Sequence, residues 1–290
     1  MTPLAGKIVV DGKDVTELHP SRRGLVTITS HPTFDMEKSV LDNVMVYRSE
    51  DRTLLNEAMS IMGLGAYQHR KCQDLDAGLQ QRVSMARALT RKPQVLILND
   101  PVDRLGFEEG LYCLQVLKQS LGTLGTTILH FTSSRQAALE LSDEILIVRE
   151  AYIVETGTPE KLYYEPETVH GASAVGEVNF VSGVGLMENH IQCNYGMPIR
   201  MPESVIVREN APCMLMFRPE AVQVSDRSER GCLNILVHCV ENTFRGSGYY
   251  TTFQSEFEKF TVYLYRPLPR DKECVLNVPY SEIHMLQREN

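Results

Sequence analysis

The sequence predicts an α/β fold with a parallel sheet, followed by a small all-β barrel. In the first part of the chain, short apolar runs alternate with segments whose apolar residues recur at helical spacing, which is typical of a parallel sheet with crossover helices. The run 95–98 is apolar throughout, as in strands buried on both faces. After about residue 175, short extended runs separated by turn residues replace this rhythm and indicate a β-barrel.

The expected elements follow in order along the chain. A turn at Asp11-Gly12 joins two short extended pieces within 6–16. Helical periodicity predicts helices over 53–62, 78–89, 107–121 and 134–142. Strands are expected over 25–29, 95–98, 126–132 and 144–148. In the barrel, strands are expected over 190–194, 213–217, 234–240, 249–253, 260–265 and 274–278.

Composition excludes several classes of function. The chain has 290 residues, enough for two domains, and a net charge of -8, which leaves no basic stripe for nucleic acid. No apolar run is as long as a membrane span, so we expect membrane contact only through a protein partner. The histidines are scattered, without the spacing of a metal site.

Two segments carry a family resemblance. Leu75-Asp-Ala-Gly-Leu-Gln-Gln-Arg-Val83, followed by Pro93-Gln-Val-Leu-Ile-Leu-Asn-Asp-Pro101, resembles the signature and the Walker B strand of ABC importer ATPases. Phe217-Arg-Pro-Glu220 resembles the hallmark of the C-terminal TOBE-type barrel of sugar, sulfate, polyamine and iron importers. The resemblance implies a P-loop NTPase-type sheet with a helical subdomain in 1–172. It implies an OB/TOBE-like barrel in 173–290.

The resemblance also assigns functional positions to this chain. Asp100 stands at the position of the catalytic glutamate, Ser133 at that of the switch histidine and Ser30 at that of the Q-loop glutamine. Asn99 stands at the magnesium-binding Walker B position, where an amide is a weaker ligand than a carboxylate. The signature positions are Asp76, Ala77, Gly78 and Gln80. Arg218 in the barrel is a candidate oxyanion ligand, or equally a structural salt-bridge residue.

A phosphate-binding loop needs a glycine-rich turn followed by Lys-Ser or Lys-Thr. Neither Gly-Lys-Ser nor Gly-Lys-Thr occurs in these residues, so the resemblance implies an incomplete nucleotide-binding domain. In the family, the segment that carries this loop also supplies a central strand of the sheet. Without that strand, we expect strands such as 95–98 to have an unpaired neighbouring edge and exposed apolar surface.

The substitutions at the other positions indicate a degenerate ATP-binding subunit of an ABC import system, regulatory or structural rather than hydrolytic. ATP and Mg²⁺ are the cofactors that the resemblance implies, although the substitutions argue against their binding. Two alternatives stay open: a true transport ATPase whose N-terminus was lost by truncation or misannotation, and a sensor of an oxyanion or a sugar through the barrel. The expected partners are an ABC permease, an intact ATPase subunit or a second copy, in the cytoplasm or at the inner face of the cell membrane.

Overall fold

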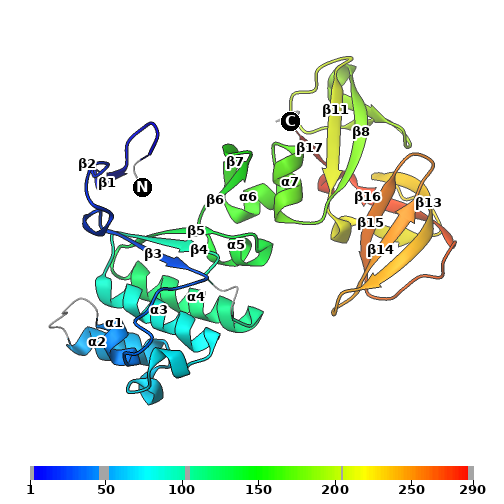
Figure 1. The fold of residues 1–290 in the computed structure, drawn as a ribbon. Coiled ribbons are helices and arrows are strands. Elements are labelled where there is room, and N and C mark those ends of the chain that lie inside the picture. The colour runs from blue at the N-terminus through cyan, green and yellow to red at the C-terminus, as the bar shows by residue number, and fades with distance from the viewer. Residues whose placement is uncertain (1–2, 46–51, 102–104, 204, 287–290) are drawn as a thin grey trace. The chain divides into compact units, whose positions relative to one another are not determined.

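The computed structural model describes residues 3–45, 52–101, 105–203 and 205–286. The chain forms two compact units, 1–141 and 142–290 (Figure 1). This is a division by packing, and the functional boundary after residue 172 stays a prediction. Within the described ranges, no helix has the length and apolar character needed to cross a membrane.

The first unit is built on a parallel sheet of three strands. These are β3 (Leu25–Thr29), β4 (Val95–Asn99) and β5 (Thr127–Phe131), in the order β3-β4-β5. The predicted parallel α/β arrangement is confirmed. The expectation of an unpaired edge beside 95–98 was wrong, because β3 and β5 flank β4 on its two sides. Among the described strands, β3 and β5 each pair only with β4, so the open edges of this sheet lie on β3 and β5.

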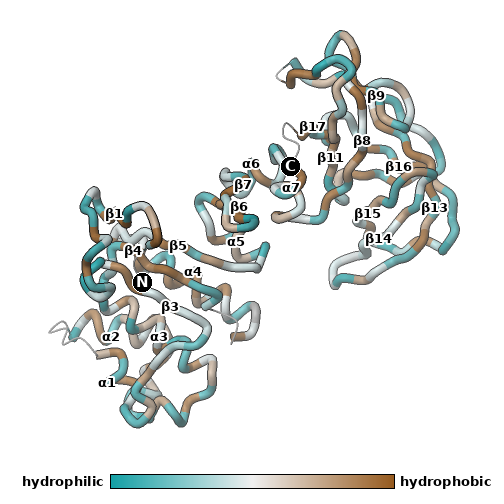
Figure 2. The backbone as a smooth tube through the Cα atoms, turned by 45° about the horizontal axis from the view of Figure 1, so that its top comes forward, coloured by the Kyte–Doolittle hydropathy of each residue, from teal (hydrophilic) through white to brown (hydrophobic). Residues whose placement is uncertain are grey.

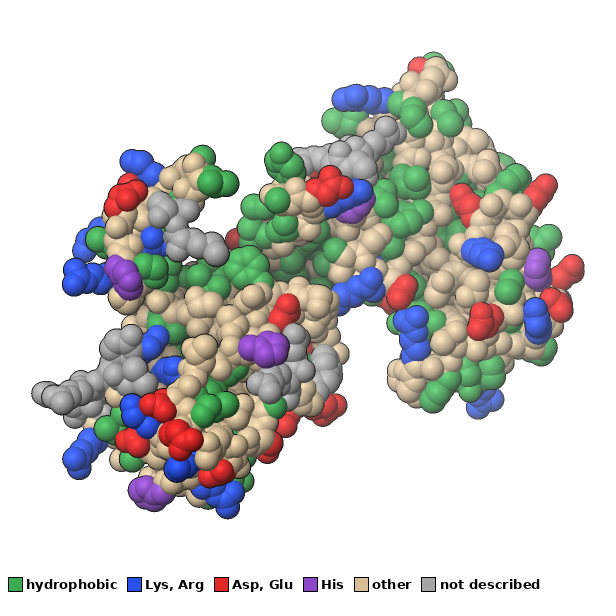
Figure 3. Space-filling model, in the orientation of Figure 1, with side chains coloured by type: hydrophobic (Ala, Val, Ile, Leu, Met, Phe, Trp, Pro, Cys, Tyr) green, Lys and Arg blue, Asp and Glu red, His purple; other side chains and the backbone are tan. Residues whose placement is uncertain are grey.

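One face of this sheet is packed and the other is open. Ile28, Leu96 and Leu98 point into a core shared with the helices. On the opposite face, Leu129 and Phe131 of β5 are 45% and 57% exposed. Figure 3 shows hydrophobic side chains at the surface in this part of the unit. The expected exposed apolar surface is therefore present, and it lies on β5, the strand paired with β4.

Helices cover the packed face and extend into a helical layer. They are α1 (Val40–Val44), α2 (Arg52–Ile61), α3 (Ala77–Arg91), α4 (Phe107–Gly122) and α5 (Arg135–Leu141). Helix α3 ends at Lys92, which adopts the left-handed conformation common at helix ends. A hairpin of β1 (Val9–Val10) and β2 (Lys13–Asp14) precedes the sheet, and its turn residues Asp11 and Gly12 both have positive φ. That pair of angles is the type I′ turn that the Asp-Gly sequence favours.

The second unit contains a hairpin, two short helices and two antiparallel sheets. The hairpin is β6 (Ile145–Arg149) with β7 (Tyr152–Gly157), and the helices are α6 (Pro159–Tyr164) and α7 (Val169–Val175). One five-stranded sheet, in its spatial order, contains β10 (Ile199–Arg200), β9 (His190–Cys193), β8 (Asn179–Leu186), β11 (Pro212–Phe217) and β17 (His284–Leu286). The other contains β12 (Gln223–Ser225), β16 (Glu273–Pro279), β13 (Cys232–Phe244), β14 (Tyr249–Gln254) and β15 (Lys259–Leu264).

Both sheets of the second unit contribute to one core. Phe217 of β11 and Phe260 of β15 stack with ring centroids 5.9 Å apart. Figure 2 shows hydrophobic and hydrophilic residues interleaved along these strands, as expected for sheets with one packed and one solvated face. The predicted change to an all-β part is confirmed, and its strands form antiparallel sheets. Its specific assignment as an OB/TOBE-type barrel stays a prediction.

Candidate functional site

Four of the predicted site residues come together at the carboxyl edge of the β3-β4-β5 sheet. The parallel register aligns Thr29 with Asn99 and Asn99 with Phe131, so all three strands end at the same level. Ser30 and Asp100 follow directly, and Ser133 follows two residues after β5. Because ligands of open α/β sheets bind outside the carboxyl ends of the strands, this edge is the candidate functional site.

Asp100 occupies a constrained position at this edge. Its backbone N–H donates to the carbonyl oxygen of Phe131 at 3.1 Å, which extends the pairing of β4 and β5 by one residue. Its φ is +43°, in the left-handed region that few side chains adopt, and Pro101 follows it. Asn99 is exposed and ends β4 with a neutral amide. A metal ion at this edge would therefore meet one carboxylate and one amide.

The loop after β3 is held by local hydrogen bonds. The hydroxyl of Ser30 lies 3.1 Å from Nδ1 of His31. The hydroxyl of Thr29 donates to the carbonyl oxygen of His31 at 3.1 Å. Serine has a shorter side chain than the glutamine of the family pattern, so its hydroxyl stays close to the backbone of this loop.

The four signature positions lie elsewhere, at the N-terminus of α3. Asp76 is the N-cap of the helix, and its carboxylate accepts a hydrogen bond from the backbone N–H of Leu79 at 2.8 Å. Ala77 begins the helix. A Cβ at Gly78 would lie 3.0 Å from Leu105, which leaves little room for a side chain. The Gln80 amide donates to the carbonyl oxygens of Cys72 and Leu75, at 3.1 and 3.3 Å, and thus holds the loop before the helix.

Two residues connected with the carboxyl edge were missed in the sequence. Gln81 is fully buried, and its amide donates to the carbonyl oxygen of Thr29 at 3.1 Å, joining α3 to the end of β3. His130 of β5 is half-buried, and its burial lowers the pKa of the imidazole while the charge of Asp100 opposes that shift. A signal existed for Gln81, since helical spacing places it on the same side of α3 as Met85 and Ala88, which are both buried.

Comparison with known proteins supports the resemblance. Residues 1–103 match the ABC transporter family. The chain is 28% identical to the spermidine/putrescine import ATP-binding protein PotA of Bacteroides fragilis, over 99% of this chain and 63% of that protein. The PotA proteins of Acetivibrio thermocellus and Vibrio vulnificus (strain YJ016) are 25% and 28% identical, over 99% and 83% of this chain and 82% and 67% of their own lengths. The chain is therefore similar to the ATP-binding subunits of ABC importers.

The matched region includes most of the predicted site. Ser30, the signature positions, Asn99 and Asp100 all lie within residues 1–103, whereas Ser133 and Arg218 lie beyond it. The relatives are named as ATP-binding proteins, so ATP and Mg²⁺ are the ligands against which this site is compared. The residues present fit these ligands poorly, because a carboxylate caps α3 and a neutral amide stands at the end of β4.

In the structure, Arg218 contacts backbone carbonyl oxygens of its own chain. Its side chain is buried and donates to the carbonyl oxygens of Tyr163, Ala172 and Glu177 at 2.7–3.0 Å. Its guanidinium also lies 4.1 Å from the ring centroid of Tyr163. These carbonyls belong to the ends of α6 and α7 and the residue leading to β8, so Arg218 fastens the two helices to β11. A role in binding an oxyanion stays a prediction.

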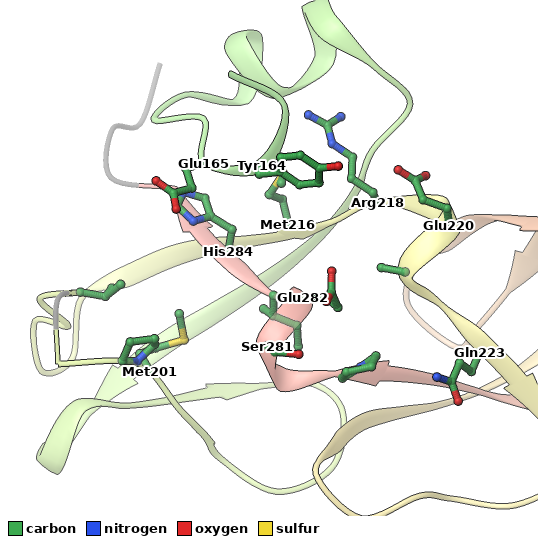
Figure 4. Close-up of a pocket in the computed structure, with 15 residues that line it drawn as sticks. Tyr164, Glu165, Met201, Met216, Arg218, Glu220, Gln223, Ser281, Glu282 and His284 are labelled. Atoms are coloured by element: carbon green, nitrogen blue, oxygen red, sulfur yellow. The ribbon is translucent and has the colours of Figure 1, made fainter. Parts of the chain in front are cut away.

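A cavity of about 760 Å³ lies beside Arg218, between β11, β17 and the end of α6 (Figure 4). Its lining combines apolar groups such as Met216 with the acidic side chains of Glu165, Glu220 and Glu282. Burial raises the pKa of Tyr163, and the hydrogen bond that its hydroxyl donates to Glu220 adds to this shift. Arg218 and His284 also line this cavity, so acidic and basic side chains both contribute to its wall.

Proposed function

We propose that the chain is a non-hydrolytic homologue of the ATP-binding subunit of an ABC import system, with a regulatory or structural role. The observation that carries this proposal is the capping of α3 by Asp76. A helix N-terminus attracts phosphate through its free N–H groups and its dipole. Here the carboxylate takes the N–H of Leu79 and places a negative charge where the resemblance implies a phosphate. A phosphate approaching α3 would meet repulsion instead of a donor.

The carboxyl edge of the sheet supports the same proposal. Asn99 supplies no charge for Mg²⁺, and Asp100 has a side chain one methylene shorter than the glutamate of the family pattern. Small displacements of a catalytic base cost much of the rate. Ser133 supplies a hydroxyl where the pattern has an imidazole. These substitutions affect metal binding, water activation and phosphate contact separately.

The proposed partners follow from how ABC ATPases assemble. In the family, the signature of one subunit completes the nucleotide site of the other. A subunit whose signature reads Asp76-Ala77-Gly78 would give an intact partner a defective site. We therefore propose docking on an ABC permease or on an intact ATPase subunit at the inner face of the cell membrane. The names of the relatives make spermidine and putrescine the first cargoes to test.

The test compares phosphate release from Mg-ATP by this chain and by the PotA protein of Bacteroides fragilis. We expect turnover from the relative and none above the blank from this chain. Turnover by this chain that disappears in Asp100→Asn would overturn the proposal and support a true ATPase.

A mixing experiment tests the signature separately. The relative is assayed with an excess of this chain, as wild type and as the double variant Asp76→Ser, Ala77→Gly. If the two subunits associate, the double variant is expected to support more hydrolysis by the relative than the wild type does. Equal support by both, with association verified by co-purification, would contradict the role assigned to Asp76.

A further inference from the structure

The cavity beside Arg218 has walls from four separate segments of the chain. These are the end of α6, the loop after β10, the stretch from β11 to β12, and the stretch from the end of β16 to β17. All four belong to the second unit, 142–290. The volume of about 760 Å³ is of the size that small-molecule pockets have, roughly 300–1,000 Å³.

Tyr164 at the end of α6 presents an aromatic ring at this cavity. The residue is 62% exposed, and its ring meets that of Tyr163 edge to face with centroids 5.1 Å apart. Tyr163 is itself held, because its hydroxyl donates to Glu220 and the guanidinium of Arg218 lies 4.1 Å from its ring centroid. Tyr164 is therefore an exposed aromatic surface with a fixed neighbour, a type of group that anchors ligands at low cost in conformational entropy.

The polar side chains around the cavity fall into two groups. The basic ones bind the backbone: Arg218 donates to three carbonyl oxygens, and Nε2 of His284 donates to that of Pro166 at 2.9 Å. The others make no side-chain hydrogen bond with any described residue, and they are Glu165, Gln223, Ser281 and Glu282. Each has an oxygen that accepts, and the amide and the hydroxyl also donate. This second group can bind a ligand without breaking a contact of the fold.

The charges and the floor of the cavity favour a neutral ligand with many hydroxyl groups. The glutamates of the wall would repel an anion, and the guanidinium of Arg218 would oppose a cation. Met201, Met216 and Ile283 are buried and give the cavity an apolar floor. Sugars combine hydroxyl groups that donate and accept with C–H groups that pack on an aromatic ring. In Figure 4, Tyr164 lies on one side of the cavity and Glu282 on the other, as such a ligand requires.

We propose that this cavity binds a neutral polyhydroxy compound, such as a mono- or disaccharide, between Tyr164 and the polar groups of Gln223, Ser281 and Glu282. A ligand in this position contacts α6 and both β-strand stretches at once. It therefore stabilises the attachment of α6 to the sheets of the second unit. The inference does not depend on whether the chain hydrolyses ATP.

The test is a nuclear magnetic resonance titration of the full chain with five probes at concentrations up to the millimolar range. Glucose, maltose and trehalose are the neutral probes, inorganic sulfate is the anion and putrescine is the cation. We expect at least one neutral probe to shift the backbone amides of α6 and of residues 281–283 in a saturable way. Sulfate and putrescine are expected to leave these amides unchanged.

Three variants locate the binding. Glu282→Ala and Gln223→Ala each remove a hydrogen-bonding group and are expected to weaken binding about tenfold. Tyr164→Leu keeps an apolar side chain but removes the aromatic ring, and a similar loss is expected. All three positions are exposed, so the substitutions should leave the fold intact. Glu256→Ala, at an exposed position outside the cavity wall, is the matched control and should bind as the wild type does.

Three results would overturn the proposal. The first is the absence of saturable shifts with every neutral probe. The second is binding of sulfate or putrescine at these amides without binding of a neutral probe, because charge would then select the ligand. The third is an affinity for the neutral probe that is the same in Glu282→Ala and Tyr164→Leu as in Glu256→Ala. None of these results affects the proposal on ATP hydrolysis, which is tested by phosphate release.

Discussion

The two units differ in whether their buried polar side chains have hydrogen-bond partners for all of their polar atoms. In the second unit, Arg218 and Asn277 are buried and each makes several hydrogen bonds. In the first unit, Gln81 and His130 each keep a buried atom without a hydrogen-bond partner among the described residues. A closed hydrogen-bond network fixes one arrangement, whereas an unsatisfied one leaves room for change. The buried polar groups of the second unit are therefore held by more contacts than Gln81 and His130, which lie near the sheet edge of the first unit.

Glu155 of β7 is another buried polar residue of the second unit whose hydrogen bonds are made. Its buried carboxylate accepts from the backbone N–H groups of Glu167 and Thr168 and from the hydroxyl of Thr168, at 2.7–3.1 Å. Thr168 in turn caps α7 by accepting from the N–H of Gly171 at 2.8 Å. Glu155 thereby ties the β6–β7 hairpin to α7, as Arg218 ties α6 and α7 to β11.

The largest effect is expected from Arg218→Ala. Removing the guanidinium leaves the carbonyl oxygens of Tyr163, Ala172 and Glu177 without this donor. We expect a loss of about 3 kcal/mol in the free energy of unfolding of the second unit. Urea unfolding with amide hydrogen exchange of β11 and β13 measures it for that unit. Arg200→Ala, at an exposed position on β10, is the control and should change stability by less than about 0.5 kcal/mol. A loss below about 1 kcal/mol for Arg218→Ala would contradict the fastening role.

A somewhat smaller effect is expected from Gly171→Ala in α7. A Cβ at this position would overlap the carboxylate oxygen of Glu155, which cannot move without breaking its contacts with Thr168. We expect a destabilisation of about 2 kcal/mol, measured by urea unfolding.

The matched control is Gly122→Ala at the end of α4 in the first unit, where an added Cβ meets nothing within 4 Å. Alanine favours a helix over glycine, so this change should be neutral or stabilising by up to about 1 kcal/mol. Similar losses for both variants would show that the network around Glu155 is no more rigid than the surface of the first unit.

Helix α3 in the first unit gives an effect of intermediate size. Asp76→Ala removes the cap of the helix and should cost about 1 kcal/mol, whereas Asp76→Ser should stay within about 0.5 kcal/mol of the wild type, because both residues cap well. The pair separates stability from chemistry, since serine restores the family residue without disturbing the helix. Urea unfolding of the two variants decides. A large loss in Asp76→Ser would mean that the carboxylate has a structural task beyond capping.

The sequence predicted the framework more fully than the site. The apolar run 95–98 and the helical spacing of 78–89 identified β4 and α3, because burial and periodicity are local properties of a sequence. The two open edges, on β3 and β5, could not be located from the sequence, since strand order depends on contacts distant in the chain. Arg218 could be recognised, but not its carbonyl partners, which lie more than 40 residues away. His130 gave no signal, because an unpaired buried nitrogen arises only from packing.

The smallest effect concerns pH and compares two histidines, one in each unit. His284 of β17 donates from Nε2 to the carbonyl oxygen of Pro166 at 2.9 Å, whereas Nε2 of His130 has no such acceptor among the described residues. Burial lowers the pKa of both imidazoles, and the contact with Pro166 opposes the shift in His284. Both therefore contribute stability that is complete above the unfolded pKa of about 6.5 and is lost as pH falls through it.

Urea unfolding of the full chain between pH 8 and pH 5 measures this loss. His130→Gln and His284→Gln are each expected to flatten the dependence of unfolding free energy on pH, while His69→Gln, at an exposed position, leaves it unchanged. Amide exchange of β5 and of β17 separates the two contributions by unit. If only β17 lost protection against amide exchange as pH fell, the expected role of His130 would be contradicted. The pH-sensitive group would then lie in the second unit, whose buried polar groups have hydrogen-bond partners.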